Sequence, residues 1–396
     1  MREVLPALME WWEAGETVGM GTVVATFRSA PRPPGASMLV GPDDSAVGSV
    51  SGGCVEGAVY DLAQEVVGSG TPQLQRYGVS DDDAFAVGLA CGGILDVYVE
   101  KVDRTTFPEL AEIAADVEAG RPVAVATVVE HPDPRRVGLR AIIRPSGIVP
   151  DEKHLDPDER GAFRPGLSGT LGSPRADDAV HDDALGILAT GHDALLTYGP
   201  DGERRGEGMR VFVWAFAPAP RMLVFGAIDF AAAVARVGTF LGYRVTVCDA
   251  RPVFATNTRF PDADEVVVEW PHRYLAAEHE AGRLDARTVV AVLTHDPKFD
   301  VPLLEKALRM PELAYVGAMG SRRTHDDRLA RLKEVGVTDE EIARLHSPSG
   351  LDIGARTPEE TAISIAAEMV AGRWGGTGRP LAEADGRIHG GADDPM

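Results

Sequence analysis

After residue 220, short apolar runs alternate with amphipathic stretches, and this alternation constrains the fold more than any other feature of the sequence. The runs are residues 222–225, 244–248, 265–269, 288–293 and 314–318. Runs that are apolar at most positions are typical of parallel strands buried on both faces. Helical segments such as 230–241 and 301–308 separate them. Because strands that alternate with helices form parallel sheets, the sequence predicts a Rossmann-like domain over residues 221–372.

The chain before this domain has a different pattern. Residues 217–220 are Ala-Pro-Ala-Pro, which predicts a linker. Residues 1–216 predict a mixed α/β domain, with helices at 4–13 and 55–67 and strands at 17–27, 37–40, 46–50, 94–99, 122–129 and 139–143. No long internal repeat is visible. Residues 373–396 are rich in glycine, so we expect a disordered tail there. The fold class is therefore α/β, with an N-terminal mixed domain and a C-terminal Rossmann-like domain that contains a parallel sheet.

Charge and cysteine usage exclude several classes of function. The net charge is -22 over 396 residues, which disfavours binding to nucleic acid or to anionic membranes. The most apolar window, 211–228, contains two prolines and an arginine, so it does not predict a membrane span. The three cysteines show no disulfide or zinc spacing, and the first residues do not resemble a signal peptide. We therefore expect a cytoplasmic protein.

Two of the three cysteines stand beside a pair of glycines. The segments are Ser51-Gly52-Gly53-Cys54 and Ala90-Cys91-Gly92-Gly93. Glycine permits positive φ and close backbone approach, so such a loop can line a concave wall with N–H groups, and the thiol can touch a bound ligand. The alternative is two tight turns beside small buried cysteines. The third cysteine, Cys248, lies inside an apolar strand and is expected to be a core residue.

The start of the second domain partly matches a dinucleotide-binding fingerprint. Gly226 follows a strand, Ala231 can serve as the last small residue, and Asp249 ends the next strand, where an acid accepts ribose hydroxyls. Ile228 stands where a second glycine would admit the pyrophosphate, and Asp229 would repel it. The fold signal is therefore stronger than the signal for NAD(P).

Further polar residues follow later strands of the same domain. His295 comes after one strand, and Ser321, Arg322 and Arg323 open a helix after another. Ligands bind beyond the carboxyl ends of parallel strands, and a helix N-terminus with two arginines suits an anion. The alternatives are a solvated helix face for the arginines and a backbone-bonded loop residue for His295.

Taken together, these motifs resemble the xanthine dehydrogenase accessory proteins of the XdhC/CoxI type. The matching segments are 29–38, 48–56, 90–93, 315–323 and 346–362, so the resemblance extends over nearly the whole chain except its acidic middle and its tail. The chain departs from the family at Ile228 and Asp229, where a fuller glycine motif is usual, and at Thr324, where a lysine is common. Both departures weaken the case for a bound nucleotide.

The resemblance implies a chaperone that binds molybdenum cofactor, protects it during sulfuration and delivers it to a molybdenum hydroxylase such as xanthine dehydrogenase. We further expect a homodimer, and a cysteine desulfurase is a candidate partner. We expect a non-catalytic carrier rather than an enzyme. An NAD(P)-dependent oxidoreductase and a docking scaffold without cofactor are the alternatives.

A carrier of this kind needs donors for the phosphate of its cargo and a soft ligand for molybdenum. The glycine loops at 52–53 and 92–93, together with Arg32, are the candidates for the phosphate, and Cys54 and Cys91 are candidate molybdenum ligands. Glu56 either orients the first loop or favours the helix N-terminus. The remaining candidate contacts are Gly226, Asp249, His295, Ser321, Arg322 and Arg323.

Overall fold

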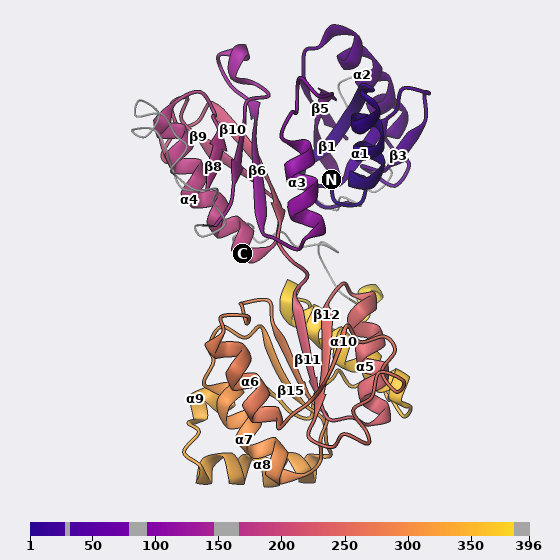
Figure 1. Cartoon of the computed structure of the whole chain (residues 1–396), viewed down its shortest axis with the longest axis vertical. Coiled ribbons are helices and arrows are strands. Elements are labelled where there is room, and N and C mark those ends of the chain that lie inside the picture. Colours follow the sequence, from indigo (N-terminus) through magenta and orange to yellow (C-terminus); the bar gives the residue numbers. More distant parts are fainter. Residues whose placement is uncertain (28–31, 79–92, 146–165, 384–396) are drawn as a thin grey trace. The chain divides into compact units, whose positions relative to one another are not determined.

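The computed structural model describes residues 1–27, 32–78, 93–145 and 166–383. The chain forms two compact units, Met1–Pro218 and Ala219–Ala384 (Figure 1). The division between them falls inside the proline-containing segment 217–220.

The first unit contains two five-stranded sheets with the same topology. The first module consists of β1 (Val18–Phe27), β2 (Ser37–Val40), β3 (Ala46–Gly48), α2 (Glu56–Ser69), β4 (Gln73–Tyr77) and β5 (Ile94–Val102), in the sheet order β3-β2-β1-β5-β4. The second module consists of β6 (Val123–Glu130), β7 (Arg140–Ile143), β8 (Leu167–Gly169), α4 (Pro174–Thr190), β9 (Ala194–Tyr198) and β10 (Met209–Phe216), in the order β8-β7-β6-β10-β9. In each module the helix lies between the third and fourth strands.

The two modules also agree in backbone detail. Gly48 and Gly169 end the third strands with φ of 89° and 82°. A Cβ atom there would lie 2.3 Å and 2.4 Å, respectively, from a carbonyl oxygen of the second strand, so each position requires glycine. Helices α2 and α4 end at Gly70 and Gly191, both with φ of 71°. The first unit is therefore a duplicated fold, which the sequence analysis did not reveal.

The modules pack through one common core. Helix α2 covers one face of the first sheet, and α4 covers one face of the second. The opposite faces contribute Met20, Tyr98, Val125 and Trp214 to a core that also includes residues of α1 (Leu5–Ala14) and α3 (Leu110–Glu118). Burial of apolar side chains from both modules in one core makes them a single folding unit.

Buried ion pairs join the modules beside this core. Asp96 of β5 accepts hydrogen bonds from Arg76 at 2.6 Å and from Arg210 of β10 at 2.9 Å. Burial would raise the pKa of Asp96, but these two guanidinium groups outweigh it and lower the pKa. Glu100 and Arg140 form a second buried pair. Loss of one partner would leave a buried charge, so these pairs fix how the modules meet.

The second unit has one parallel sheet in the order β13-β12-β11-β14-β15-β16. Its strands are β11 (Arg221–Phe225), β12 (Arg244–Asp249), β13 (Glu265–Val268), β14 (Val289–Val292), β15 (Tyr315–Ala318) and β16 (Leu345–His346), and every neighbouring pair is parallel. This is the strand order of a Rossmann fold. The predicted fold class is confirmed.

Helices cover both faces of the parallel sheet (Figure 1). Helices α5 (Asp229–Phe240) and α10 (Pro358–Trp374) pack on one face. Helices α6 (Pro271–Glu280), α7 (Pro297–Leu308) and α8 (Arg322–Glu334) pack on the other, with the short α9 (Asp339–Ile342) after them. Helix α10 continues two residues past 372, and a 3-10 turn follows at Leu381–Glu383, within the segment for which the sequence predicted disorder.

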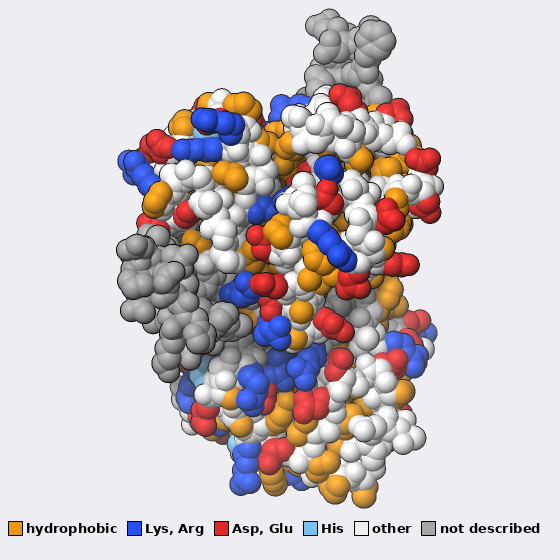
Figure 2. All heavy atoms as spheres, turned by 45° about the horizontal axis from the view of Figure 1, so that its top comes forward, with side chains coloured by type: hydrophobic (Ala, Val, Ile, Leu, Met, Phe, Trp, Pro, Cys, Tyr) orange, Lys and Arg blue, Asp and Glu red, His pale blue; other side chains and the backbone are white. Residues whose placement is uncertain are grey.

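Acidic and basic side chains are mixed on the surface displayed in Figure 2 rather than gathered in separate patches. Figure 2 shows acidic and basic side chains interspersed over the face that it displays. Among the described residues, no helix has the length and apolar character needed to cross a membrane. The net charge of -22 therefore does not produce one acidic field over the displayed face.

Candidate functional site

The loop between β3 and α2 is organised by the carboxylate of Glu56. This carboxylate accepts the Ser49 hydroxyl at 2.7 Å and the backbone N–H groups of Ser51 and Gly53, both at 2.9 Å. The Ser51 hydroxyl donates to the same carboxylate. Glu56 is the first residue of α2, so its charge also lies at the favourable end of the helix. Glu56 therefore both orients the loop and places a negative charge at the N-terminus of α2.

The remaining donors of the loop are also satisfied internally. The Ser51 hydroxyl accepts the N–H of Cys54 at 2.9 Å and that of Val55 at 3.0 Å, and the N–H of Gly52 donates to Ser49 Oγ at 2.9 Å. The N–H groups at 52–54 thus already have acceptors within the loop, which does not favour the predicted role of the glycine loop at 52–53 in phosphate binding. The glycines do not form an anion-binding nest here, and the loop offers a ligand its thiol instead.

The thiol of Cys54 stands next to open space. Gly52 and Gly53 have φ of 77° and 119°, and a Cβ atom on either would meet no other atom within 4 Å. Both glycines are exposed and Cys54 is partly exposed. Cys248, by contrast, is buried in β12, where burial raises the pKa of its thiol far above the ordinary value. Of these two thiols, only Cys54 can reach a ligand.

The electrostatics of the loop keep Glu56 charged. Burial acts to raise the pKa of Glu56, but the hydroxyls of Ser51 and Ser49 and the N–H of Ser51 outweigh it and hold the pKa at about 2. The carboxylate is therefore ionised at any physiological pH and holds the loop in one conformation.

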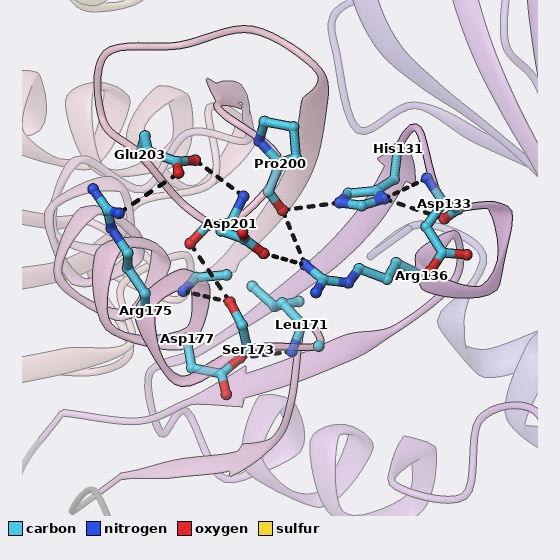
Figure 3. A network of polar contacts seen from close by, with 12 residues as sticks. His131, Asp133, Arg136, Leu171, Ser173, Arg175, Asp177, Pro200, Asp201 and Glu203 are labelled. Atoms are coloured by element: carbon cyan, nitrogen blue, oxygen red, sulfur yellow. Dashed lines mark hydrogen bonds and ion pairs between the residues drawn. The ribbon is translucent and has the colours of Figure 1, made fainter.

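The equivalent loop of the second module is built on the same frame (Figure 3). Asp177 accepts the Thr170 hydroxyl at 2.9 Å and the Leu171 N–H at 2.6 Å. The hydroxyl lies seven residues before the carboxylate, as it does for Ser49 and Glu56 in the first module.

The two loops differ in the residues between the hydroxyl and the carboxylate. Ser173, Pro174 and Arg175 stand where the first module has Gly52, Gly53 and Cys54. Side chains fill this second loop, as Figure 3 shows: Arg136 packs 3.0 Å from the Cβ position of Gly172 and donates to Pro200 O at 2.9 Å, and Arg175 pairs with Glu203 at 3.5 Å. The module thus folds without a Gly-Gly-Cys sequence. The open loop and its thiol in the first module are not a requirement of the fold.

In the second unit, the predicted dinucleotide position is a small open pocket of about 210 Å³, and the acidic residues around it are paired within the chain. Asp249 accepts the N–H of Ala227 at 2.7 Å and is clamped by the guanidinium of Arg251 at 2.8 and 2.9 Å. Both oxygens predicted to receive ribose hydroxyls are therefore occupied. Asp229 pairs with Arg259 at 3.2 Å at the start of α5. This arrangement opposes NAD(P) binding by the usual route.

Gly226 has a structural reason to be glycine. Its φ is 111°, and a Cβ atom would lie 2.8 Å from the Thr294 side chain. The loops after β11 and β14 therefore approach each other closely where a Rossmann fold usually opens its ligand crevice. Further along the same sheet edge, His295 and Arg323 line one common cavity, whereas Ser321 caps α8 and Arg322 does not line it.

Comparison with known proteins agrees with these two units. Residues 222–369 match the family described as the XdhC Rossmann domain, and residues 11–78 match the XdhC and CoxI family. The chain belongs to the XdhC family.

Individual XdhC-type relatives extend over most of the chain. A Bacillus subtilis (strain 168) protein, whose name describes a probable subunit of xanthine dehydrogenase, is 27% identical over 372 residues, which is 93% of this chain and 96% of that protein. The Escherichia coli (strain K12) protein named molybdenum cofactor insertion chaperone PaoD is also 27% identical over 372 residues, with 94% and 88% covered. A crystal structure of a Bacillus halodurans protein, described as a xanthine dehydrogenase, has a TM-score of 0.63 and 25% identity and covers 96% of this chain and 97% of that one.

Not all predicted site residues of this XdhC-family chain lie together. Arg32 pairs with Glu3 at 2.5 Å, and none of the contacts among the described residues joins it to Cys54. Gly93 is buried directly before β5. Cys91 and Gly92 lie outside the described residues, so their proximity to Cys54 stays a prediction.

Sequence reasoning missed Ser51 and, in the second unit, Asp300 and Arg328. The hydroxyl of Ser51 links Glu56 to two N–H groups, and the five-residue spacing of this pair matches no standard capping motif. Arg328 and Asp300 form a buried pair under the cavity that His295 and Arg323 line. Asp300 lies in the first turn of α7 and Arg328 in the middle of α8, where sequence alone predicts a solvated or core position.

Proposed function

We propose that the chain binds molybdenum cofactor and delivers it, with its terminal sulfur ligand in place, to a molybdenum hydroxylase of the xanthine dehydrogenase type. Two findings support the proposal. PaoD, whose name describes a molybdenum cofactor insertion chaperone, aligns over most of both chains. The first module has an open Gly-Gly-Cys loop where its structural copy is closed by Arg136 and Arg175. This second observation is the one on which the proposal chiefly depends.

The chemistry of the loop suits such a cargo. A thiolate is a soft ligand, and molybdenum with dithiolene and sulfido ligands is a soft partner. Gly52 and Gly53 have no side chains, so a flat pterin can approach the backbone beside Cys54. Glu56 and Ser51 hold the loop rigid through hydrogen bonds. Because the loop uses its own N–H groups, the phosphate of the cargo must be bound by other residues.

Retention of cofactor by thiol variants tests the proposal. Purified chain is mixed with molybdenum cofactor released from a molybdoenzyme, and the fluorescent oxidised pterin retained after ultrafiltration is measured. We expect near-equal stoichiometry for the wild type and about tenfold weaker retention for Cys54→Ala, a loss of ~1.4 kcal/mol. Cys91→Ala tests the second candidate thiol in the same assay.

The matched control is Cys248→Ala, which removes a thiol that is buried in the other unit. It should retain the cofactor as the wild type does once folding has been confirmed by circular dichroism. Undiminished retention by both Cys54→Ala and Cys91→Ala would remove the thiols from the mechanism. Delivery is tested separately, by the activity that an apo-hydroxylase gains from the loaded chain compared with free cofactor.

A further inference from the structure

A cavity of about 360 Å³ lies at the carboxyl ends of β14 and β15, between α7 and α8 of the second unit. Its charged and titratable lining residues are His295, Asp300, Arg323, Asp327, Arg328 and Arg331. The volume is within the range of small-ligand sites. Its place at the sheet edge is where open α/β folds bind ligands, although it is displaced from the usual dinucleotide position.

The wall of the cavity includes a buried ion pair with unused hydrogen-bonding atoms. Arg328 and Asp300 are 3% and 4% exposed, and their charged groups are 3.2 Å apart. Arg328 also donates to Met319 O and to Ser347 Oγ, both at 2.9 Å, so three loops of the sheet edge converge on it. Arg328 Nε and Asp300 Oδ1 have no partner among the described residues. Buried polar atoms are rarely left unpaired, and the Nε–H of Arg328 is a donor that an anionic ligand can pair.

The lining carries a net positive charge in a strongly acidic chain. Three arginines face two aspartates. Asp300 is paired with Arg328, and Asp327 is paired with Arg331 at 3.0 Å. Within the described part of the chain, Arg323 has no ion pair. One guanidinium is therefore available to an anion that enters the cavity.

Helix α8 adds backbone donors at the same place. It has 13 residues, and the Ser321 side chain accepts the N–H of Thr324. Among the described residues, the N–H groups of Arg322 and Arg323 have no acceptor. The N-terminus of α7 is different, because Asp296 caps it and pairs with Lys298 at 2.8 Å. The free donors and the free guanidinium thus coincide at α8, where the helix dipole favours a negative charge.

We propose that this cavity binds the phosphate group of a phosphorylated small molecule, with Arg323 and the N-terminus of α8 as its direct contacts. Arg328 is a positioning residue that joins the loops around the cavity. The phosphate can belong to a free nucleotide or to the phosphorylated pterin of the cargo. The proposal rests on the second unit alone and does not require the role given above to Cys54.

Titration calorimetry of the full chain with inorganic pyrophosphate tests the site. We expect saturable binding that weakens with added salt and that Arg323→Ala weakens by about fivefold or more, because a charge-assisted hydrogen bond is lost. Arg236→Ala is the matched control. It removes the same charge from an exposed position on α5 of the same unit, outside the cavity, and we expect a change of about twofold or less.

Competition identifies the source of the phosphate. Displacement of pyrophosphate by ADP identifies a nucleotide. Displacement by the oxidised phosphorylated pterin, but not by its dephosphorylated form, identifies the cargo. The proposal is overturned if the wild type does not bind pyrophosphate at millimolar concentration, if both arginine variants weaken binding equally, or if neither competitor displaces it. Cys54→Ala should bind pyrophosphate normally, so failure of the cofactor assay does not affect this result.

Discussion

At the scale of single residues, Glu56 determines the form of the candidate cofactor loop. Its carboxylate binds two hydroxyls and several N–H groups, and these hydrogen bonds lower its pKa from 4.5 to about 2 despite partial burial. A carboxyl group whose pKa is lower in the folded state stabilises the fold above its ordinary pKa. That stabilisation is lost as the pH falls through the folded-state value.

Replacement of this residue should therefore have a pH-dependent effect. We expect Glu56→Gln to reduce the free energy of unfolding at pH 7 by about 1–2 kcal/mol, a value discounted for the partial exposure of the group. The difference from the wild type should shrink between pH 4.5 and pH 2, where the wild-type carboxylate becomes protonated. Urea unfolding across this range measures it. Glu65→Gln, on the same helix, is the control, and a Glu56→Gln deficit that is constant with pH would contradict the explanation.

At the scale of elements, the two modules of the first unit form a natural comparison. Both loops begin with a hydroxyl and end with a carboxylate seven residues later. The second is packed by Arg136 from a neighbouring turn and carries Arg175, which pairs with Glu203, whereas the first leaves a thiol beside open space. The residues that differ between the two loops are therefore the ones to exchange in a test of binding.

An exchange of loops separates folding from binding. Replacement of residues 50–55 by the sequence of residues 171–176 should keep the free energy of unfolding within about 2 kcal/mol of the wild type, because the second module already folds with that sequence. Chemical denaturation measures the change. Cooperative unfolding that is lost altogether would show that the Gly-Gly-Cys sequence is needed for the fold, contrary to our interpretation.

The sequence predicted the parallel sheet well and the first unit less well. Strands of the second unit are apolar on both faces, so β11, β12, β14 and β15 are visible as continuous apolar runs. Strand β8 has only three residues, and β9 is a five-residue apolar run inside a stretch rich in polar residues, glycine and proline, so the sequence analysis assigned neither as a strand. Without these strands, the repeated topology could not be recognised.

The sequence identified several residues of the candidate site, but it did not predict which hydrogen bonds they make. The glycines marked Cys54 as accessible, and Ile228 and Asp229 marked the dinucleotide position as doubtful. Two outcomes depended on side-chain geometry: Arg251 turns back onto Asp249, and Glu56 takes the loop N–H groups. Such contacts cannot be deduced from spacing alone.

At the scale of the whole molecule, the two units offer different chemistry. The first offers an accessible thiol in a rigid loop without free N–H donors at 52–54. The second offers a cavity with an unpaired arginine among its described residues. Each unit can therefore be tested by itself, the first with thiol variants and the second with arginine variants.

The most direct test of this account is the pterin content of protein purified from a molybdenum-replete host. Oxidised pterin fluorescence is compared for the wild type and for the loop-exchange variant, in which residues 50–55 are replaced by the sequence of residues 171–176. The account predicts close to one pterin per wild-type chain and a small fraction of that in the folded loop exchange. Equal pterin in both, or none in the wild type, would contradict it.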